Sequence, residues 1–312
     1  MEDVLVIGAS NTDLCGESRA KIIHGDSNIG KVTMAPGGVG HNIALNIALM
    51  GTPVRFITAI GNDGFGRVME EHLRKHLNIE DAIWPDTGSG VYLYVADADG
   101  DMYVAVNDMA ITERIDASFL RTKRETIEKA KLLVVDANLT AEAIFEATSS
   151  AKGIVMADCV STLKADRLRP SFSNLSVLKP NMMELEYLSE VEIMDEKSLR
   201  KAADVLFDKG VKALLVTNGT KGSAYMSPER VIHAPCLPTK CVNATGAGDS
   251  FLGGFAHGLL KTGDPAEALR YAAVASAITV NSEETVSSVM SDALIENKIM
   301  EIETDDKVSG LF

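Results

Sequence analysis

The stretch Asn243–Phe251, NATGAGDSF, places two glycines and one acidic residue directly in front of an apolar helical pattern. Phe251, Phe255 and Leu259 recur at the i, i+4, i+8 spacing of a single helix face, so a helix is expected near 247–261. A glycine-rich loop that opens such a helix is typical of α/β proteins that bind an anion at the helix N-terminus. The stretch therefore predicts a core helix with an anion site at its start.

Gly246, Ala247 and Gly248 are expected to form that anion hole. Glycine lets the backbone approach a ligand, and a helix start supplies unbonded N–H groups and partial positive charge. Asp249 in the first turn has two interpretations, because it can complement the helix dipole or accept a proton from an attacking hydroxyl. Two glycines are more than a simple cap needs. We therefore predict phosphoryl transfer, with Asp249 as the base.

The bulk composition sets limits on function. The chain has 312 residues, 46% hydrophobic and 24% charged, which fits one α/β domain spanning residues 1–312. A net charge of −14 disfavours nucleic acid as a partner, and no apolar run is long enough to predict a membrane span. The four cysteines are scattered and the start does not resemble a signal peptide. A protein of the reducing cytoplasm is expected.

Short β-branched runs alternate with longer amphipathic stretches along the chain. Apolar strands between helices are typical of a mostly parallel sheet that is covered on both faces. The expected strands are Val4–Ile7, Val54–Ile60, Leu132–Asp136, Ile154–Asp158, Val177–Leu178 and Ala213–Thr217. The expected helices lie near 42–50, 64–77, 140–151, 183–189, 197–209, 247–261 and 265–281.

Two regions, about 12–35 and 89–110, break this alternation. Two strand-like runs in the second region flank Asp99-Gly100, a strong hairpin signal. Both regions are strand-like departures from the N-terminal half, so we predict that they pair into a small β-sheet that forms a lid. Two independent surface hairpins are the alternative.

Two near-matches to nucleotide motifs fail. Gly25–Thr33 almost spells a Walker A loop, but Val32 replaces the hydroxyl residue and no helix pattern follows. Gly37–Asn42 lacks the last glycine of a dinucleotide fingerprint, because Ile43 takes that place. A P-loop enzyme and a nicotinamide dehydrogenase are both disfavoured.

A phosphoryl donor needs its own site, and two segments that follow strands are candidates. Asn181 and Glu184 have the spacing of an amide that contacts phosphate and a carboxylate that holds magnesium through water. The same spacing is that of a helix capping box, which spacing alone favours. The loop Thr217–Gly222 can surround a nucleotide or form an ordinary hairpin turn.

Polar residues near the first strand are candidates for holding an acceptor. Asn11 and Asp13 follow Val4–Ile7 at the carboxyl end of the sheet, where open α/β sheets bind ligands, although both types are also common in turns. A second glycine-opened helix and the end of another strand add further candidates, which are Gly37, Gly38, Asn42 and Asp136.

Two segments resemble the signature motifs of the PfkB/ribokinase family of carbohydrate and nucleoside kinases. They are GGVGHNIALNIALMG…IGNDGFG (Gly37–Gly66) and NATGAGDSFLGGF (Asn243–Phe255), and KPNMMELE is similar to the NxxE motif of that family. The resemblance extends from Gly8 to about Asn281. It implies a ribokinase-like three-layer αβα domain with a small β-sheet lid, and ATP and Mg²⁺ as cofactors.

The resemblance also implies a role for each candidate. Asp249 is the base and Gly246–Gly248 the anion hole, while Glu184 serves magnesium. The residues implied to bind the acceptor are Asn11, Asp13, Gly37, Gly38, Asn42 and Asp136. Those implied to serve ATP are Asn181, Thr217, Gly219 and Gly222.

Within the family, DSNIGKVTMAPGGVGHNIALNIALMG and the lid hairpin GDMYVAVNDMAIT look most similar to the pseudouridine kinases. The implied reaction is ATP-dependent phosphorylation of the 5′-hydroxyl of pseudouridine, with Asn107 and Asp108 placed to recognise the base. Two alternatives stay open: a kinase for another nucleoside or a free sugar, and a non-catalytic sensor. The intact aspartate and glycines disfavour the sensor.

Three further expectations concern ions, assembly and His41. Ribokinase has an aspartate where this chain has Asn243, which puts K⁺ activation in question, although backbone carbonyls can still hold the ion. Lid sheets of the family often pair between subunits, so a homodimer is expected. His41 is assigned packing or a surface contact and no catalytic role.

Overall fold

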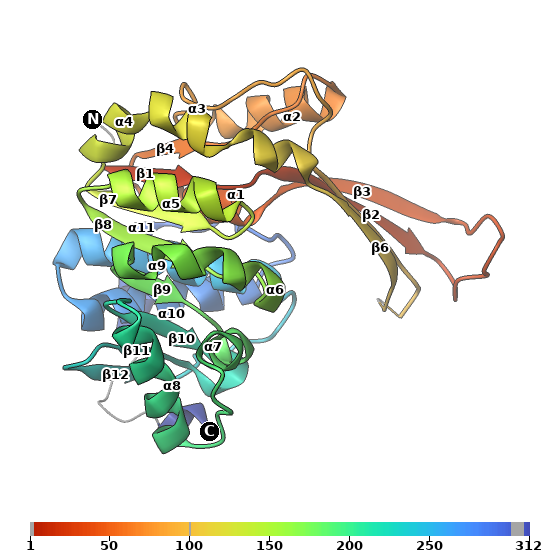
Figure 1. Cartoon of the computed structure of the whole chain (residues 1–312). Helices are drawn as coiled ribbons and strands as arrows, with labels where there is room; N and C mark the ends of the chain where they lie inside the picture. The colour runs from red at the N-terminus through yellow and green to blue at the C-terminus, as the bar shows by residue number, and fades with distance from the viewer. Residues whose placement is uncertain (1–2, 100, 301–308) are drawn as a thin grey trace.

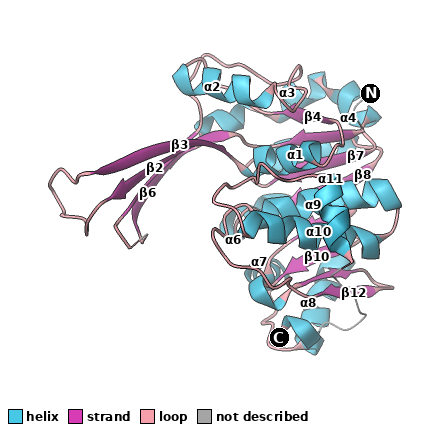
Figure 2. Cartoon of the chain, turned by 180° about the vertical axis from the view of Figure 1, so that it is seen from behind, coloured by secondary structure: helices cyan, strands magenta, loops and turns pink. Residues whose placement is uncertain are grey.

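The first strand, β1 (Val4–Ile7), lies within the main sheet of the computed structural model, which describes residues 3–99, 101–300 and 309–312. Val4 and Val6 pack into one hydrophobic cluster, whereas Leu5 and Ile7 pack into another. Successive side chains of a strand point to opposite faces, so each face of the sheet has its own core. Helices cover both faces (Figures 1 and 2), which confirms the predicted three-layer αβα arrangement.

The main sheet has eight strands in the order β12-β11-β10-β9-β8-β7-β1-β4. Neighbours from β10 to β4 are parallel, while β11 and β12 extend the edge as antiparallel strands. The further strands are β4 (Val54–Ile57), β7 (Leu132–Asp136), β8 (Ile154–Asp158), β9 (Val177–Lys179), β10 (Leu214–Thr217), β11 (Ser223–Met226) and β12 (Val231–Ala234). The mostly parallel sheet was predicted, but β11 and β12 were not, because short runs such as SAYM and VIHA lack a clear apolar period.

Residues of each helix join the core on only one side of the sheet. Helices on the face of Val4 and Val6 are α1 (Val39–Leu49), α2 (Gly64–Leu73), α9 (Ala247–Thr262), α10 (Pro265–Val280) and α11 (Asp292–Ile299). Those on the other face are α3 (Ala117–Thr122), α4 (Arg124–Lys129), α5 (Ala141–Ser150), α6 (Thr162–Ala165), α7 (Met182–Ser189) and α8 (Glu196–Asp208). Short 3-10 segments are η1 (Ala110–Arg114), η2 (Asp166–Asn174), η3 (Gly219–Lys221) and η4 (Ser309–Leu311). No helix within the described ranges is long and apolar enough to cross a bilayer.

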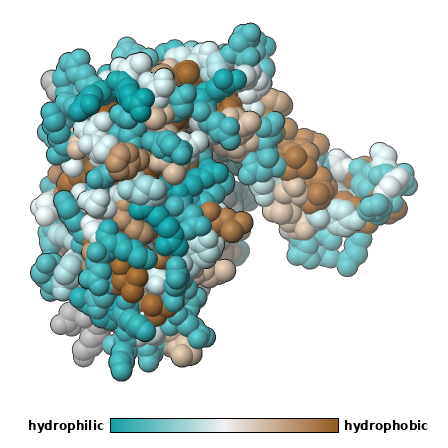
Figure 3. All heavy atoms as spheres, viewed as in Figure 1, coloured by the Kyte–Doolittle hydropathy of each residue, from teal (hydrophilic) through white to brown (hydrophobic). Residues whose placement is uncertain are grey.

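A separate four-stranded sheet projects from the main body (Figures 1 and 3). Its order is β3 (Gly30–Gly37), β2 (Asn11–Ser18), β5 (Val91–Ala96) and β6 (Met102–Asp108). The parallel pairing of β2 with β5 joins the two regions that broke the helix–strand alternation, so they form one sheet and not two separate hairpins. The Walker-like segment lies in the connection from β2 into β3 and leads into a strand, as its failed motif indicated.

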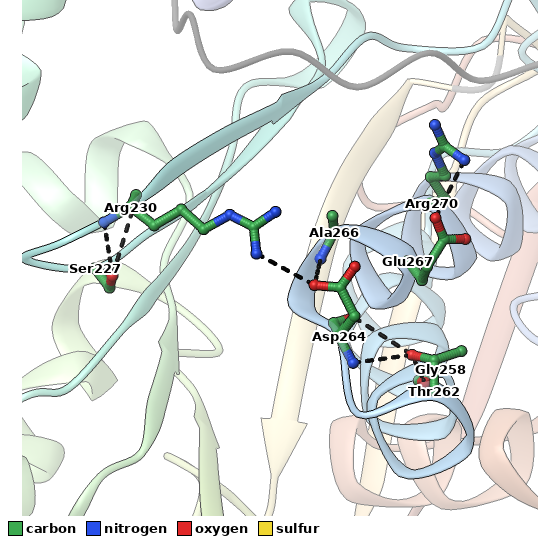
Figure 4. Close-up of polar contacts among 8 residues, drawn as sticks. All are labelled: Ser227, Arg230, Gly258, Thr262, Asp264, Ala266, Glu267 and Arg270. Carbon is green, nitrogen blue, oxygen red and sulfur yellow. Dashed lines mark hydrogen bonds and ion pairs between the residues drawn. The ribbon is translucent and has the colours of Figure 1, made fainter.

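Polar contacts hold the turn between α9 and α10 (Figure 4). The Asp264 carboxylate accepts a hydrogen bond from the N–H of Ala266 at 3.3 Å and pairs with Arg230 at 3.2 Å. The Thr262 hydroxyl donates to the carbonyl of Gly258 at 2.8 Å. An aspartate at the helix N-cap is a favourable start for α10. This turn joins the two helices, and the start of α9 and the end of α10 both line the site described next.

Candidate active site

Charged side chains gather where neighbouring strands of the main sheet end. Asp136, Asp158 and Lys179 are the last residues of β7, β8 and β9. They stand in register across the sheet, Asp136 beside Asp158 and Asp158 beside Lys179. The carboxyl edge of a parallel sheet is where open α/β folds bind their ligands. The register therefore places a charged cluster at that edge.

The first turn of α9 is open at its N-terminus. Gly246 caps the helix in the left-handed conformation with φ 80°, and a Cβ at this position would clash with the carbonyl oxygen of Thr285. No side chain caps the turn, and the first intrahelical bond runs from the N–H of Ser250 to the carbonyl of Gly246 at 2.9 Å. The N–H groups of Gly248 and Asp249 precede that bond. They are the donors that a helix start leaves for a ligand.

The buried Asp249 carboxylate contacts the start of another helix. Asn42 of α1 donates from Nδ2 to Asp249 Oδ2 at 2.8 Å. Burial, and next the charge of Asp158, raise the pKa of Asp249 to about 7, while Asn42 and Lys179 oppose the rise. A carboxylate whose pKa lies near neutrality is suited to general-base work.

Asp158 and Lys179 form a buried ion pair that sequence reasoning missed. Lys179 Nζ lies 2.9 Å from Asp158 Oδ2, and both side chains are at most 8% exposed. Burial lowers the pKa of Lys179, but the charge of Asp158 and the hydrogen bond to it outweigh burial, so the net shift is upward. A Cβ at Gly248 would lie 2.8 Å from Nζ, so the ammonium group adjoins the open turn of α9. The sequence signal is one charged residue at the end of each apolar run, IVMAD and VLK.

The predicted acceptor residues Asn11, Asp13 and Gly37 lie together at the base of the small sheet. Asn11 donates from Nδ2 to Asp13 Oδ1 at 2.5 Å. Asn11 is also paired with Gly37 in the β2–β3 ladder, and a Cβ at Gly37 would clash with the Asp13 carboxylate. Gly38 follows as the N-cap of α1. Burial raises the pKa of Asp13, and the hydrogen bond from Asn11 only partly opposes this.

Asp136 holds the backbone at the end of β1. Its carboxylate accepts hydrogen bonds from the N–H of Ala9 at 2.9 Å and of Asn138 at 2.8 Å. A Cβ at Gly8 would clash with this carboxylate, so the group fits tightly against the chain. Burial raises the pKa of Asp136 to about 6. The structure thus assigns Asp136 a structural contact, and its contact with an acceptor stays a prediction.

A cavity of about 490 Å³ lies between the predicted nucleotide loop and the open turn of α9. Pockets of this size accommodate small organic ligands. Thr217, Gly219 and Gly222 line it on one side, and Ala247 and Gly248 line it on the other. The loop is both a hairpin connection from β10 to β11 and a wall of the cavity, so its two interpretations are compatible. Asn181 does not line the cavity but pairs with Thr217 across the strand ends.

Asn181 and Glu184 form a capping box at the start of α7. Asn181 Oδ1 accepts from the N–H of Glu184 at 2.9 Å, and Glu184 Oε2 accepts from the N–H of Asn181 at 2.8 Å. The capping interpretation is therefore confirmed as geometry. Burial raises the pKa of Glu184. In the described part of the chain, no group of three or more His, Cys, Asp or Glu residues could hold a metal ion, so magnesium at Glu184 would need water and phosphate ligands as well.

The Asn243 side chain is engaged within its own loop. Its Oδ1 accepts from the N–H of Thr245 at 2.9 Å, and its Nδ2 donates to the carbonyl of Glu283 at 3.2 Å. The amide therefore links this loop to the segment that follows α10. K⁺ binding here stays a prediction.

The two base-recognition candidates lie on opposite faces of the small sheet. Asp13, Tyr92 and Asn107 stand side by side in register on β2, β5 and β6, so they share one face. Asp108 is the next residue and points to the other face, where it accepts from the N–H of Ala110 at 3.4 Å. Tyr92 was missed, because only the register of β5 against β2 reveals it.

Comparisons with known proteins identify the family and the fold. The model of the pfkB family carbohydrate kinases matches residues 1–292. The pseudouridine kinase of Escherichia coli is 33% identical over 303 residues, covering 94% of this chain and 96% of that protein. Solved structures of a carbohydrate kinase from Agrobacterium tumefaciens (TM-score 0.85, 26% identity, 98% and 100% coverage) and a ribokinase from Thermotoga maritima (TM-score 0.86, 26% identity, 96% and 100% coverage) are similar.

Proposed function

Because this chain belongs to the pfkB family of carbohydrate kinases and is thus a sugar or nucleoside kinase, we propose that it phosphorylates the 5′-hydroxyl of pseudouridine with ATP. One observation carries the proposal of phosphoryl transfer. The cavity that the loop Thr217–Gly222 lines is also lined by the open turn of α9, and the same turn holds Asp249 against Asn42. A donor site and an acceptor base thereby adjoin a single anion hole.

The proposed reaction is a direct phosphoryl transfer. Asp249 accepts the proton of the 5′-hydroxyl while that oxygen bonds to the γ-phosphorus, and the bond from the γ-phosphorus to the bridging oxygen of ADP breaks. The N–H groups of Gly248 and Asp249, with the Lys179 ammonium beside them, stabilise the negative charge on the transferred group. Magnesium, held through water by Glu184, would neutralise phosphate charge.

The nucleotide is proposed to occupy the cavity. Its walls include Thr217, Gly219 and Gly222 on the β10–β11 connection and apolar residues of α10. Asn181 lies beside Thr217 and is proposed to contact a phosphate with the donor groups that its capping role leaves unused. K⁺ is proposed to bind to backbone carbonyl oxygens of the loop that the Asn243 side chain holds.

The small sheet is proposed to act as a lid that recognises the acceptor. Asp13 holds ribose hydroxyls, and the row Asp13–Tyr92–Asn107 places a ring and an amide next to it on one face. The C-linked uracil of pseudouridine carries a ring N–H that N-linked uridine lacks, and the oxygen of Asn107 can accept it. An Asn107→Leu variant is expected to lose discrimination between the two nucleosides, with Asp108→Asn on the opposite face as the control.

The other face of the small sheet is proposed to form a homodimer. Met34, Leu14, Leu93 and Val106 stand in register across the four strands and present an apolar row. Val106 is 59% and Met34 48% exposed, and Figure 3 shows apolar residues along the projecting sheet. A single-layer sheet with one apolar face requires a cover, and a second copy offers the same face. A Val106→Lys variant is expected to sediment as a monomer where the parent chain sediments as a dimer.

The first experiment is coupled ADP release with magnesium across pseudouridine, uridine, ribose, adenosine and fructose 6-phosphate. Strong preference for pseudouridine over uridine supports the proposal. Preference for another nucleoside or for ribose would keep the kinase and replace the substrate. Binding of a nucleoside with no turnover of any acceptor would favour a non-catalytic sensor. The cytoplasm is the proposed compartment, since all four cysteines are free thiols.

A further inference from the structure

A line of side-chain hydrogen bonds runs from the surface of α2 to Asp249. Half-buried His72 contacts buried His41, with 3.1 Å between their Nε2 atoms. His41 Nδ1 lies 2.9 Å from Asn42 Oδ1, and Asn42 Nδ2 lies 2.8 Å from Asp249 Oδ2. The expectation that His41 only packs is therefore incomplete, because the ring is buried and both of its nitrogens are bonded.

The ionised base determines the direction of every bond in this line. An ionised carboxylate only accepts, so Asn42 must turn its NH₂ toward Asp249 and its oxygen toward His41. That oxygen only accepts, so His41 must carry its proton on Nδ1. His41 Nε2 is then an acceptor, which His72 satisfies with an Nε2–H donor. Each donor thus points toward the base. The hydrogen bonds in such a chain polarise and strengthen one another.

An Asn42 without His41 would lose this constraint. The amide oxygen and NH₂ of asparagine are nearly alike in shape, so only their partners decide the orientation. The reversed amide would place its oxygen against Asp249, which an ionised carboxylate disfavours and a protonated one accepts. The groups around the line favour a neutral His41, since burial and next His72 lower the pKa of His41 to about 4.

We propose that His41 is a positioning residue, which orients the Asn42 amide so that an N–H donor stays on the Asp249 carboxylate, while His72 sets the tautomer of His41. The inference deepens the proposed function and rests on Asp249 as the base. Other groups also face Asp249: Asp136 of β7, Asp158 of β8 and Lys179 of β9. His72 is faced in turn by Lys75 and His76. None of these supplies the donor that His41 gives to Asn42.

The activity test compares a variant that removes the donor with one that keeps it. His41→Leu removes both ring nitrogens, whereas His41→Asn keeps an amide near the position of Nδ1. We expect His41→Leu to lower kcat about tenfold and to move the midpoint of the kcat pH profile upward by about one unit. His41→Asn should restore the midpoint. His72→Leu should give a smaller shift in the same direction, and His76→Leu, at an exposed position, should give none.

A second readout needs no substrate and so separates this inference from the proposed function. Long-range ¹H–¹⁵N spectra of the labelled parent chain report the tautomer of each histidine, with His41 assigned by its loss in His41→Leu. The expected result is a neutral His41 with the proton on Nδ1 from pH 8 to pH 9, where Asp249, with a pKa of about 7, is ionised. An Nε2–H tautomer, or identical pH midpoints for His41→Leu and the parent chain, would overturn the proposal.

Discussion

Two helices begin at the same edge of the main sheet, and their first turns are built in opposite ways. At α7, Asn181 and Glu184 satisfy each other's backbone N–H groups in a capping box. At α9, Gly246 leaves the first turn without a side-chain cap. Helix starts require partners for their first N–H groups, from the chain or from a ligand. The closed start of α7 supports the fold, and the open start of α9 is available to an anion.

The difference extends to the acidic residue in each first turn. Glu184 uses its carboxylate to cap its own helix, whereas Asp249 bonds to Asn42 on a different helix. Burial raises the pKa of both carboxylates. One first-turn acid thus caps its own helix, and we propose that it also holds magnesium, whereas the other is positioned by a distant helix, and we propose it as the base. Four measurements test this contrast, and they follow in order of decreasing expected effect.

Replacing the base should have the largest effect. Asp249→Asn keeps the shape of the side chain but removes the proton acceptor, so kcat should fall by about 10² to 10⁴ while nucleoside binding survives. The comparison is made by coupled ADP release and by calorimetric titration of the nucleoside. Asp264→Asn is the matched control, because Asp264 also begins a helix but lies at the far end of α9. Equal turnover in the parent chain and Asp249→Asn would remove Asp249 from the mechanism.

Closing the open turn should have the next largest effect. Gly246→Ala places a Cβ against Thr285 and strains a residue with φ 80°, so kcat/KM should fall about a hundredfold as the donors shift. Gly263→Ala is the control at the other end of α9, with φ 71° and open space around it. It should cost about 1 kcal/mol of unfolding free energy with activity intact. If both variants lose activity equally, the open turn has no special role.

Removing the charge of Glu184 should raise the magnesium requirement of the reaction. Glu184→Gln retains an oxygen for the capping bond, so the melting temperature should stay close to that of the parent chain. The magnesium concentration for half-maximal rate should rise about tenfold if the charge holds the ion through water. Ser198→Ala, which opens the remote capping box of α8, should lower stability and leave the magnesium requirement unchanged. An unchanged requirement in Glu184→Gln would leave Glu184 with capping alone.

The pH dependence should be the mildest effect near neutrality. Only ionised Asp249 accepts a proton, and its pKa is about 7, so kcat should be near half-maximal at pH 7 and fall with further acid. The raised pKa also means that the folded state holds this proton more tightly than the unfolded chain. The contribution of this Asp249 proton to the free energy of unfolding is complete below about pH 4 and is lost as the pH rises through about 7. Denaturant unfolding at pH 5 and pH 8 should show this loss in the parent chain and a smaller one in Asp249→Asn.

Local patterns predicted much of the fold. The six apolar runs and the seven helical periods correspond to strands and helices of the main domain, because buried faces impose a period on the sequence. The strands β5 and β6 lie on either side of the Asp99-Gly100 hairpin signal, as predicted, and Gly100 itself lies outside the described residues. The short edge strands β11 and β12 and the short helices α3, α4, α6 and α11 were missed, since a few residues cannot establish a period.

The site was predicted in part for the same reason. Gly246, Gly248 and Asp249 belong to one loop, so the shared role that we propose for them can be predicted from their spacing. Lys179 and Asp158 are 21 residues apart, and each looks like an ordinary strand end until the sheet brings them together. Their contact depends on the register of neighbouring strands, which apolar runs do not specify.

The alternation of strands and helices and the glycine loop that opens α9 follow from local sequence, because periodicity and glycine act through neighbouring residues. The contact of Asn42 with Asp249, 207 residues away, and the contact of His41 with Asn42 arise only when the chain is packed. Hydrogen bonds between distant side chains arise when packed elements bring their ends to one sheet edge. The choice of Asp249 as the proposed base therefore rests on local sequence, whereas its orientation and its pKa depend on the folded chain.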